Sequence, residues 1–493
     1  MQQSQESEGM SLTRRVDGYD VRHMGDAAVG TYDLVVIGSG PAGRRAAVQA
    51  AKAGKSVLVV EGRKRVGGVS VHTGTIPSKT LRETVLNLSG WRERGFYGRS
   101  YRVKKEIDGA DLGMRLGKTL DHEVDVLEHQ FQRNGVHTMA GFARFLDPHR
   151  LQVTEPDGST LVVEGDNILI AVGTVPFHPD NVDFDDPAIM DSDEVVEQLN
   201  VPRSLTVVGA GVIGIEYATI FSALDSAVTV IEPRETFLDF IDREIIAEFV
   251  HQLRDRGVIF RLGSPVVSVE RDAEGKVVTT TQDGRTARTD MLLYCAGRMG
   301  ATATLGLENC GIETDKRGRI AVDSRTMQTS VPHIYAAGDV IGFPSLASTS
   351  MEQGRLAACH AFGLPMPPAP NYFPFGIYAV PEISAVGMSE EEVKAKGIRY
   401  ECGIARFRET SRGHIMGLEQ GMMKMIFSLK TRRLLGVHII GEGATELIHI
   451  GQAVLNLKGT IDFFIENTFN YPTLAEAYKI AALDAWNRMP MKA

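Results

Sequence analysis

YDLVVIGSGPAGRRAAVQAAKAGKSVLVVE (residues 32–61) predicts a strand, a tight turn, a helix and a second strand. Gly38 permits the turn, Gly40 leaves room for the backbone to approach a pyrophosphate, and Gly43 lets the helix pack close to the strand. The N-terminus of the helix offers unpaired N–H groups and a positive dipole to phosphates. Glu61, at the end of the second strand, is placed to accept hydrogen bonds from ribose hydroxyls. The stretch therefore predicts a Rossmann-type unit that binds a dinucleotide.

SLTVVGAGVIGIEYATIFSALDSAVTVIE (residues 204–232) repeats this pattern later in the chain. Gly209, Gly211 and Gly214 take the three glycine positions, and Glu232 follows the first of them by 23 residues, the same interval as in the first copy. One glycine-rich turn is weak evidence for a nucleotide site, but here each copy has its strand, helix and acid in place. Two copies predict two dinucleotides. A flavin and a nicotinamide form the simplest pair, because a flavin can accept a hydride from a nicotinamide.

The composition excludes several classes of protein. A length of 493 residues is enough for about three domains, and 43% hydrophobic residues with 23% charged residues are typical of a soluble globular chain. The net charge of −9, without any block of lysine or arginine, argues against a nucleic-acid partner, whose binding rests on clustered cations. The four cysteines show no CxxC spacing and no set of nearby histidines that suggests a zinc site, so no metal site is expected.

The sequence predicts no membrane segment. Its most apolar window, residues 205–224, coincides with the second glycine pattern and is better explained as a buried strand that leads into a buried helix. The first 31 residues are polar and without periodicity, which predicts a disordered tail. No apolar stretch follows Arg14 and Arg15, as a twin-arginine export signal would require. We therefore expect a cytoplasmic protein.

Four further motifs carry a resemblance to a known family. TSVPHIYAAGDVIG (329–342) is similar to a second flavin motif, ILIAVGTVP (168–176) and LLYCAGRMG (292–300) to two crossings between domains, and FNYPTLAEAY (469–478) to a motif at a subunit interface. With the two glycine patterns, they make the chain resemble the pyridine nucleotide-disulfide oxidoreductase family, which includes dihydrolipoamide dehydrogenase and glutathione reductase. The resemblance extends from Tyr32 to the C-terminus.

The segment GGVSVHTGTIPSK (residues 67–79) departs from this family at its redox centre. Disulfide enzymes of the family read G-G-x-C-x-N-x-G-C-x-P-S-K here, whereas Ser70 and Thr75 occupy the two cysteine positions. Hydroxyls form neither a disulfide nor a thiolate, so electrons cannot leave a flavin by thiol exchange. Tyr471 stands where these enzymes carry a histidine that transfers protons, and a phenol with a pKa of about 10 is poorly matched to that task at neutral pH.

The resemblance leaves the half that joins flavin and nicotinamide intact. It implies that Lys79 lies beside the flavin N5 with Glu216 as its ion-pair partner, and that Asp339 hydrogen-bonds the ribityl chain. Glu232 suits a free ribose 2′-hydroxyl, whereas Arg234 can turn its guanidinium toward a 2′-phosphate. The implied contacts to FAD are Gly38, Gly40, Gly43, Glu61, Gly68, Lys79, Gly338 and Asp339, and those to NAD(P) are Gly209, Gly211, Gly214, Glu216, Glu232, Arg234 and Gly297.

Within the family, the whole-chain pattern resembles the soluble, Si-specific NAD(P)+ transhydrogenases. This implies FAD-dependent hydride transfer between NADPH and NAD+, with ping-pong kinetics through reduced flavin and no disulfide intermediate. Those enzymes usually keep a cysteine where Ser70 stands, so the chain departs from them as well. Two alternatives stay open: a thiol-free NAD(P)H diaphorase that reduces quinones or oxygen, and a non-catalytic flavoprotein that senses the nicotinamide pool. Intact Lys79 and Glu216 count against the sensor, which needs no hydride geometry.

The implied fold is α/β, with two Rossmann-like domains and a C-terminal α+β dimerisation domain. Residues 265–286 alternate between apolar and polar types, which predicts the hairpins of a β-meander. PSLASTSMEQGRLAA (344–358) predicts a helix whose dipole, by resemblance, faces the flavin. An apolar helix at 443–457 predicts packing against a second subunit, hence a homodimer or a higher homo-oligomer. The expected boundaries are 1–31 for the tail, 32–178 and 297–366 for the FAD domain, 179–296 for the NAD(P) domain and 367–493 for the dimerisation domain.

Overall fold

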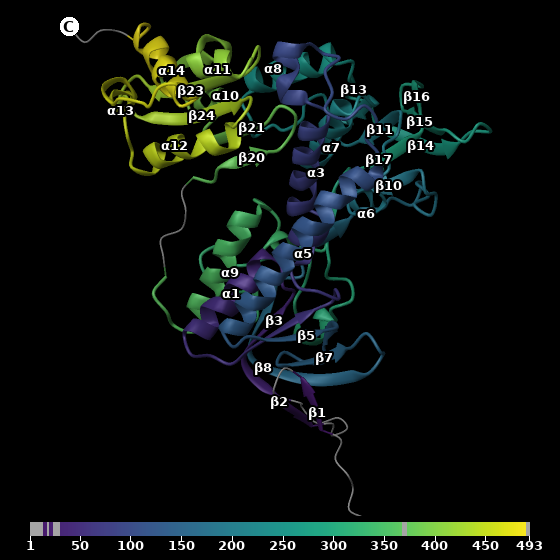
Figure 1. Cartoon of the computed structure of the whole chain (residues 1–493). Helices are drawn as coiled ribbons and strands as arrows, with labels where there is room; N and C mark the ends of the chain where they lie inside the picture. The colour runs from purple at the N-terminus through teal and green to yellow at the C-terminus, as the bar shows by residue number, and fades with distance from the viewer. Residues whose placement is uncertain (1–12, 17–18, 23–29, 367–371, 490–493) are drawn as a thin grey trace, which may run out of the picture. The chain divides into compact units, whose positions relative to one another are not determined.

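The computed structural model describes residues 13–16, 19–22, 30–366 and 372–489 (Figure 1). Backbone contacts divide the chain into two compact units. The first unit comprises residues 1–75, 120–175 and 298–369, and the second comprises residues 76–119, 176–297 and 370–493. Each unit encloses hydrophobic cores of its own.

The first unit is built on a seven-stranded sheet. Its strands, in spatial order, are β5 (His137–Ala140), β4 (Val57–Glu61), β3 (Thr31–Ile37), β8 (Thr160–Ile170), β7 (Arg150–Thr154) and β6 (Phe142–Phe145), with β19 (Ile334–Ala336) beside β8. Strands β5, β4, β3, β8 and β19 are linked by parallel pairing, whereas β8, β7 and β6 pair antiparallel. Strand β4 is buried at every position, as expected for a parallel strand covered on both faces.

Two longer helices belong to this unit, α1 (Pro41–Lys52) and α9 (Ala347–Ala361). Its short elements are the helix α2 (Gly68–His72), the 3₁₀ turns η2 (Leu307–Cys310) and η3 (Asp339–Ile341), and the strand pair β9 (Thr174–Pro176) and β18 (Arg298–Gly300). Helix α5 (Gly109–Arg133) contributes residues to both units.

Helices α1 and α9 lie side by side (Figure 1). A Cβ added at Gly354 of α9 would lie 2.0 Å from the carbonyl oxygen of Ala42 in α1, so only glycine permits this approach. Helix α9 begins three residues later than the sequence predicts. Ser345 has a φ of +47° and Leu346 is extended, so neither residue can belong to a right-handed helix. The hydroxyl of Thr349 then accepts a hydrogen bond from the N–H of Leu346 at 3.3 Å.

The second unit contains three sheets. The parallel sheet has, in order, β10 (Ile189–Asp191), β17 (Met291–Tyr294), β11 (Ser204–Val208), β12 (Ala227–Ile231) and β13 (Ile259–Arg261). The antiparallel meander has β14 (Val266–Arg271), β15 (Val277–Thr281) and β16 (Thr286–Thr289). The antiparallel C-terminal sheet has β20 (Phe375–Ile377), β21 (Ile383–Gly387), β24 (Leu434–Ile440), β23 (Met422–Ser428) and β22 (Tyr400–Arg406).

The remaining elements of the second unit are helices and 3₁₀ turns. They are α3 (Thr75–Leu88), α4 (Arg94–Tyr97), α6 (Glu194–Gln198), α7 (Val212–Ala223), α8 (Arg243–Asp255), α10 (Glu390–Ala395), α11 (Ser411–Ile415), α12 (Ala444–Asn456), α13 (Ile461–Glu466) and α14 (Glu476–Trp486), with the 3₁₀ turns η1 (Trp91–Glu93) and η4 (Phe407–Glu409). The C-terminal sheet packs against α14 on β22 and β23, and against α12 on β21 and β24. The predicted meander is confirmed, and the apolar window at 205–224 is indeed β11 followed by α7.

A buried ion cluster joins α8 to the C-terminal sheet within the second unit. The ammonium of Lys424 lies 3.0 Å from a carboxylate oxygen of Asp242 and 2.5 Å from one of Glu390. Desolvation raises the pKa of Glu390, but hydrogen bonds from Lys394, Lys424 and Tyr400 outweigh it and lower that pKa to about 2. The cluster therefore stays charged at neutral pH and fixes the end of α8 at which Asp242 caps the helix.

Two sequence predictions concern the chain as a whole. No helix in the described ranges is both long and apolar enough to cross a membrane. Within the stretch expected to form an irregular tail, the structure has a short antiparallel hairpin, β1 (Thr13–Val16) with β2 (Tyr19–Arg22). Residues 1–12, 17–18 and 23–29 lie outside the described part, so the tail stays a prediction, as do the domain boundaries.

Candidate active site

The first glycine pattern forms an open cradle at the N-terminus of α1. Gly38 has a φ of +100°, and an added Cβ there would lie 2.4 Å from the carbonyl oxygen of Ala171. A Cβ at Gly43 would lie 1.9 Å from the carbonyl oxygen of Gly38, whereas a Cβ at Gly40 would meet nothing within 4 Å. Two of the glycines are thus required by the protein's own packing, and Gly40 alone borders free space. This is the arrangement that a pyrophosphate at a helix N-terminus needs.

Glu61 is held in one orientation beside this cradle. One carboxylate oxygen accepts hydrogen bonds from the backbone N–H of Ser39 at 2.9 Å and from its hydroxyl, and the other accepts from the N–H of Arg63 at 2.9 Å. The Ser39 hydroxyl also accepts a hydrogen bond from the N–H of Gly67 at 2.7 Å. Ser39 therefore connects Glu61, which is expected to bind a ribose, to the segment that precedes α2. The sequence signal for this role is only that a hydroxyl residue fills a variable position of the glycine pattern.

Asp339 and Gly338 lie at the turn that precedes α9 in the sequence. The N–H of Gly338 donates to the side-chain oxygen of Gln353 in α9 at 2.9 Å, and its φ of +84° favours glycine. Burial raises the pKa of Asp339, and the charge of Arg298 opposes that rise. Arg298 is itself fixed by two hydrogen bonds of 2.8 Å to the hydroxyl and carbonyl oxygens of Thr174. A desolvated acid of this kind suits a hydrogen bond to a polyol chain.

In the segment 67–79, which has no thiols, the side chains of Ser70 and His72 contact backbone carbonyl oxygens of nearby residues. The hydroxyl of Ser70 donates to the carbonyl oxygen of Gly67 at 3.2 Å. A ring nitrogen of His72 lies 3.2 Å from the carbonyl oxygen of Arg65 and 3.0 Å from that of Val66, so this nitrogen carries the proton. The four cysteines are free, and none belongs to this segment. Among the described residues, no group of histidine, cysteine, aspartate and glutamate side chains is placed to hold a metal ion.

The second glycine pattern has the same construction as the first. A Cβ at Gly209 would lie 2.7 Å from the carbonyl oxygen of Cys295, and one at Gly214 would lie 2.0 Å from that of Gly209. A Cβ at Gly211 would meet nothing within 4 Å, and neither would one at Gly297. The unit thus presents a second open cradle at the N-terminus of α7, and Gly297 borders open space as well.

Glu232 is bound to the second glycine pattern in the same way as Glu61 is bound to the first, through a backbone N–H of the pattern. One of its carboxylate oxygens accepts from the N–H of Ala210 at 2.8 Å. The other accepts from the N–H of Arg234 at 3.2 Å and from its guanidinium at 2.7 Å. Glu232 is buried, whereas Arg234 is 56% exposed. Arg234 therefore lies beside Glu232, the acid expected to bind a ribose, and its positive charge offsets that of the carboxylate.

Lys79 and Glu216 form the predicted ion pair, although 137 residues separate them. The Lys79 ammonium lies 2.7 and 2.9 Å from the two carboxylate oxygens of Glu216, whose side chain is only 4% exposed. The backbone N–H of Tyr378 donates to the same carboxylate at 2.9 Å, and its ring centroid lies 5.0 Å from the ammonium. No side-chain pattern could have indicated Tyr378, because the hydrogen bond comes from its backbone.

The side chains of Tyr471 and Glu476 form no hydrogen bond with each other in the described part of the chain. The phenol of Tyr471 lies 2.8 Å from the hydroxyl of Ser411 and is exposed. One carboxylate oxygen of Glu476 is enclosed and has no hydrogen-bond partner within the described part of the chain.

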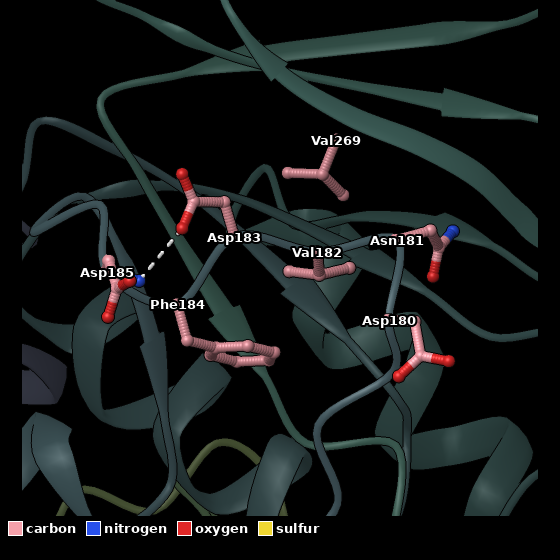
Figure 2. A pocket seen from close by; sticks show the side chains of 7 residues that line it. All are labelled: Asp180, Asn181, Val182, Asp183, Phe184, Asp185 and Val269. Atoms are coloured by element: carbon pink, nitrogen blue, oxygen red, sulfur yellow. Dashed lines mark hydrogen bonds between the residues drawn. The ribbon is translucent and has the colours of Figure 1, made fainter.

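A pocket of about 600 Å³ lies in the second unit, and none of the glycines of the second cradle lines it (Figure 2). Asp180, Asp183 and Asp185 line it together with Phe184 and Val269. Figure 2 shows the N–H of Asp185 bonded to the carboxylate of Asp183, at 3.0 Å. Three carboxylates repel phosphates, so this pocket does not suit a nucleotide.

Known proteins match the chain over almost its whole length. Residues 32–354 match the pyridine nucleotide-disulphide oxidoreductase model, and residues 373–482 match the dimerisation domain of the same family, which indicates a homo-oligomer. A soluble pyridine nucleotide transhydrogenase from Mycobacterium tuberculosis is 50% identical over 93% of this chain and 98% of its own. One from Escherichia coli O9:H4 is 40% identical, with coverage of 93% and 98%.

Solved structures agree with these matches. The HOCl-induced flavoprotein disulfide reductase RclA from Escherichia coli superposes with a TM-score of 0.83 at 26% identity, over 92% of this chain and 99% of that one. LpdA from Mycobacterium tuberculosis superposes with a TM-score of 0.83 at 27% identity, over 91% and 99%. The two cradles, their anchored acids and these matches agree on one conclusion: the chain belongs to the pyridine nucleotide-disulphide oxidoreductase family.

Proposed function

We propose that this chain catalyses hydride transfer between NADPH and NAD+ as a soluble transhydrogenase with FAD as its cofactor. The observation that carries the proposal is the pair of similarly built cradles in a chain with no thiol at residues 70 and 75. The two cradles can bind a flavin and a nicotinamide nucleotide, which exchange a hydride. The hydroxyls of Ser70 and Thr75 cannot form a disulfide, so electrons cannot leave the flavin by that route. Relatives 40–50% identical to the chain bear the name soluble pyridine nucleotide transhydrogenase, which supports the same reaction.

The first cradle is the proposed FAD site, and its residues fit that group. Gly40 admits the pyrophosphate, the N-terminus of α1 faces it, Glu61 accepts from the ribose, and Asp339 accepts from the ribityl hydroxyls. FAD supplies a ring system that takes up a hydride from one nicotinamide and yields it to another. The protein supplies position and charge around that ring.

Lys79 is proposed to act beside the reacting atoms. Glu216 holds its ammonium with two hydrogen bonds, and the N–H of Tyr378 holds Glu216 in turn. A preorganised cation lowers the energy of negative charge that arrives next to it, and it does so without reorganising at the moment of reaction.

The second cradle is the proposed nicotinamide site. Gly211 and the N-terminus of α7 receive the pyrophosphate, and Glu232 receives the ribose. Because the described residues offer this one cradle for the nicotinamide nucleotides, NADP(H) and NAD(H) must occupy it in turn. That predicts ping-pong kinetics, with the hydride transferred to and from one face of the flavin; the resemblance to the Si-specific transhydrogenases implies the Si face. We further propose a homodimer, supported by the match of residues 373–482 to a dimerisation domain.

The test is an anaerobic reaction of the purified protein with NADPH and a thio-analogue of NAD+. A transhydrogenase forms the reduced thio-analogue, and initial rates at several fixed NADPH concentrations give parallel double-reciprocal plots. Failure to form the reduced analogue, with a quinone reduced instead, would establish the diaphorase alternative. If NADPH reduces neither acceptor and the flavin keeps its absorbance, the sensor alternative holds and the proposal is wrong.

A further inference from the structure

The segment 378–382 makes hydrogen bonds to two helices of the second unit, and the first of these is α7. The backbone N–H of Tyr378 donates to the carboxylate of Glu216 at 2.9 Å, and the N–H of Val380 donates to the hydroxyl of Thr219 at 3.0 Å. Glu216 and Thr219 lie on one face of α7, because residues three apart in a helix are neighbours. The segment therefore holds α7 at two points, and one of them is the carboxylate of the proposed site.

Arg82 of α3 binds the same segment from the second helix. Its Nε donates to the carbonyl oxygen of Ala379 at 2.9 Å, and a terminal nitrogen of its guanidinium lies 3.1 Å from the carboxylate of Glu382. Both side chains of this ion pair are buried. The C=O of Ala379 and the N–H of Val380 belong to one trans peptide bond, so they point in opposite directions and bind one helix each.

The acceptors of Arg82 account for its whole guanidinium. Its other terminal nitrogen donates to the carboxylate of Glu83 at 2.8 Å. The second carboxylate oxygen of Glu382 accepts hydrogen bonds from the N–H and the hydroxyl of Thr445 in α12, at 3.1 and 2.8 Å. Two carboxylates thus balance the charge of Arg82, and one of them is fixed from another element. Arg82 can therefore affect the site through the geometry that it imposes, rather than through its electric field.

The contacts of α3, α7 and the segment 378–382 form a closed ring. Lys79 and Arg82 are three residues apart in α3, so their side chains leave the helix on the same side. The ammonium of Lys79 binds Glu216, the N–H of Tyr378 binds the same carboxylate, and Arg82 binds the carbonyl group of the next residue. We propose that Arg82 is a positioning residue for hydride transfer, which fixes the segment 378–382 and thereby holds Glu216 and the ammonium of Lys79 in place. This inference rests on the proposed function.

The test measures flavin reduction in the flavin-containing protein by anaerobic stopped-flow at increasing NADPH concentrations. This separates the limiting rate of reduction from the dissociation constant of NADPH. Arg82→Gln should lower the limiting rate by about fivefold or more, because the cation loses its fixed position. The second cradle is unchanged, so the dissociation constant should change by less than about twofold. An arginine with a purely structural role would lower the melting temperature and leave the limiting rate of the folded protein unchanged.

A double variant decides whether the effect passes through Lys79. Lys79→Met removes the ammonium that Arg82 is proposed to position. Adding Arg82→Gln to Lys79→Met should therefore slow flavin reduction by less than about twofold further, because two residues that act as one unit give non-additive losses. Losses that multiply in the double variant overturn the inference, and so does an unchanged limiting rate in Arg82→Gln alone.

Arg92→Gln is the matched control. Arg92 binds the same Glu83 at 3.1 Å and also Glu442 at 2.9 Å, but among the described residues no hydrogen bond joins it to the segment 378–382. Its substitution should lower the melting temperature without changing the limiting rate.

Arg82→Lys covers the case in which Arg82→Gln does not fold. Lysine keeps the charge beside Glu382 but lacks the planar fork that reaches two acceptors at once, so the limiting rate should fall by a smaller factor. An unchanged limiting rate in Arg82→Lys would then overturn the inference. A wild-type protein whose flavin NADPH does not reduce contradicts the proposed function itself, which is a different outcome.

Discussion

Replacing Glu216 with glutamine should remove the negative charge that holds the Lys79 ammonium, and so lower both stability and the rate of flavin reduction. The substitution keeps the shape of the side chain but removes the counter-charge from an ammonium that lies 2.7 and 2.9 Å from it. Removal of one partner from a fully buried ion pair costs about 3–5 kcal/mol. Lys79 is 26% exposed, so water screens part of the loss, and we expect about 2 kcal/mol. For a chain of this length, this difference corresponds to a melting temperature lower by about 2–3 °C.

The assay is a double-mutant cycle of Glu216→Gln and Lys79→Met, read by thermal melting and by the rate at which NADPH bleaches the flavin absorbance. A formed pair makes the double variant lose less stability than the two single variants together. Both single variants should slow the bleaching by about tenfold or more, because the cation is no longer held in place. Glu308→Gln, which breaks an exposed pair with Arg144, should change neither reading. Additive stability losses, or unchanged bleaching rates, would refute the reasoning.

Further predictions concern the cradles, the thiols and the ion cluster. Gly40→Val should fold normally but purify without flavin, whereas Gly43→Val should melt at a lower temperature, because only the second glycine is required by packing; flavin absorbance and melting curves distinguish them. NADPH should bleach the flavin without a long-wavelength charge-transfer band, and lipoamide and glutathione disulfide should not be turned over; detectable disulfide reduction contradicts this. Arg234→Ala should weaken NADPH about tenfold and leave NADH nearly unchanged, in titrations of the bleaching rate, because it exposes the charge of Glu232. Glu390 has its pKa lowered, so its stabilising contribution is full above pH about 4.5 and is lost as the pH falls toward 2. The melting difference between wild type and Glu390→Gln should therefore be greatest near neutral pH and shrink on acidification.

The sequence predicted those features that depend on residue type at short range. The two glycine patterns could be located because a turn with positive φ and a close approach between helix and strand each require glycine, as Gly38 and Gly43 do. Within the two glycine patterns, the order of strand, helix and strand followed from apolar runs and turn residues, and the meander followed from its alternation. The pairing of Lys79 with Glu216 followed only from resemblance, since nothing local links residues so far apart.

The sequence could not predict contacts made by backbone groups or across neighbouring strands. The N–H of Tyr378 reaches Glu216 from the C-terminal sheet, and a backbone donor leaves no pattern in the sequence. The partner of Arg234 was also hidden, because it depends on the path of the loop between β12 and α8. The late start of α9 required the backbone of Ser345, which no propensity fixes.

The missing side chain at Gly354 has a consequence for how this protein can vary. A methyl group there would have to occupy the position of the Ala42 carbonyl, so any other residue must drive α9 and α1 apart. The first turns of both helices would then be displaced, and the first turn of α1 begins directly after Gly40 of the first cradle. Flavin retention alone should therefore select glycine at position 354, although that residue lies in the middle of a helix and is proposed to touch no ligand. In a randomised library, this position would be scored as a binding residue, while its actual role is to set the distance between two helices.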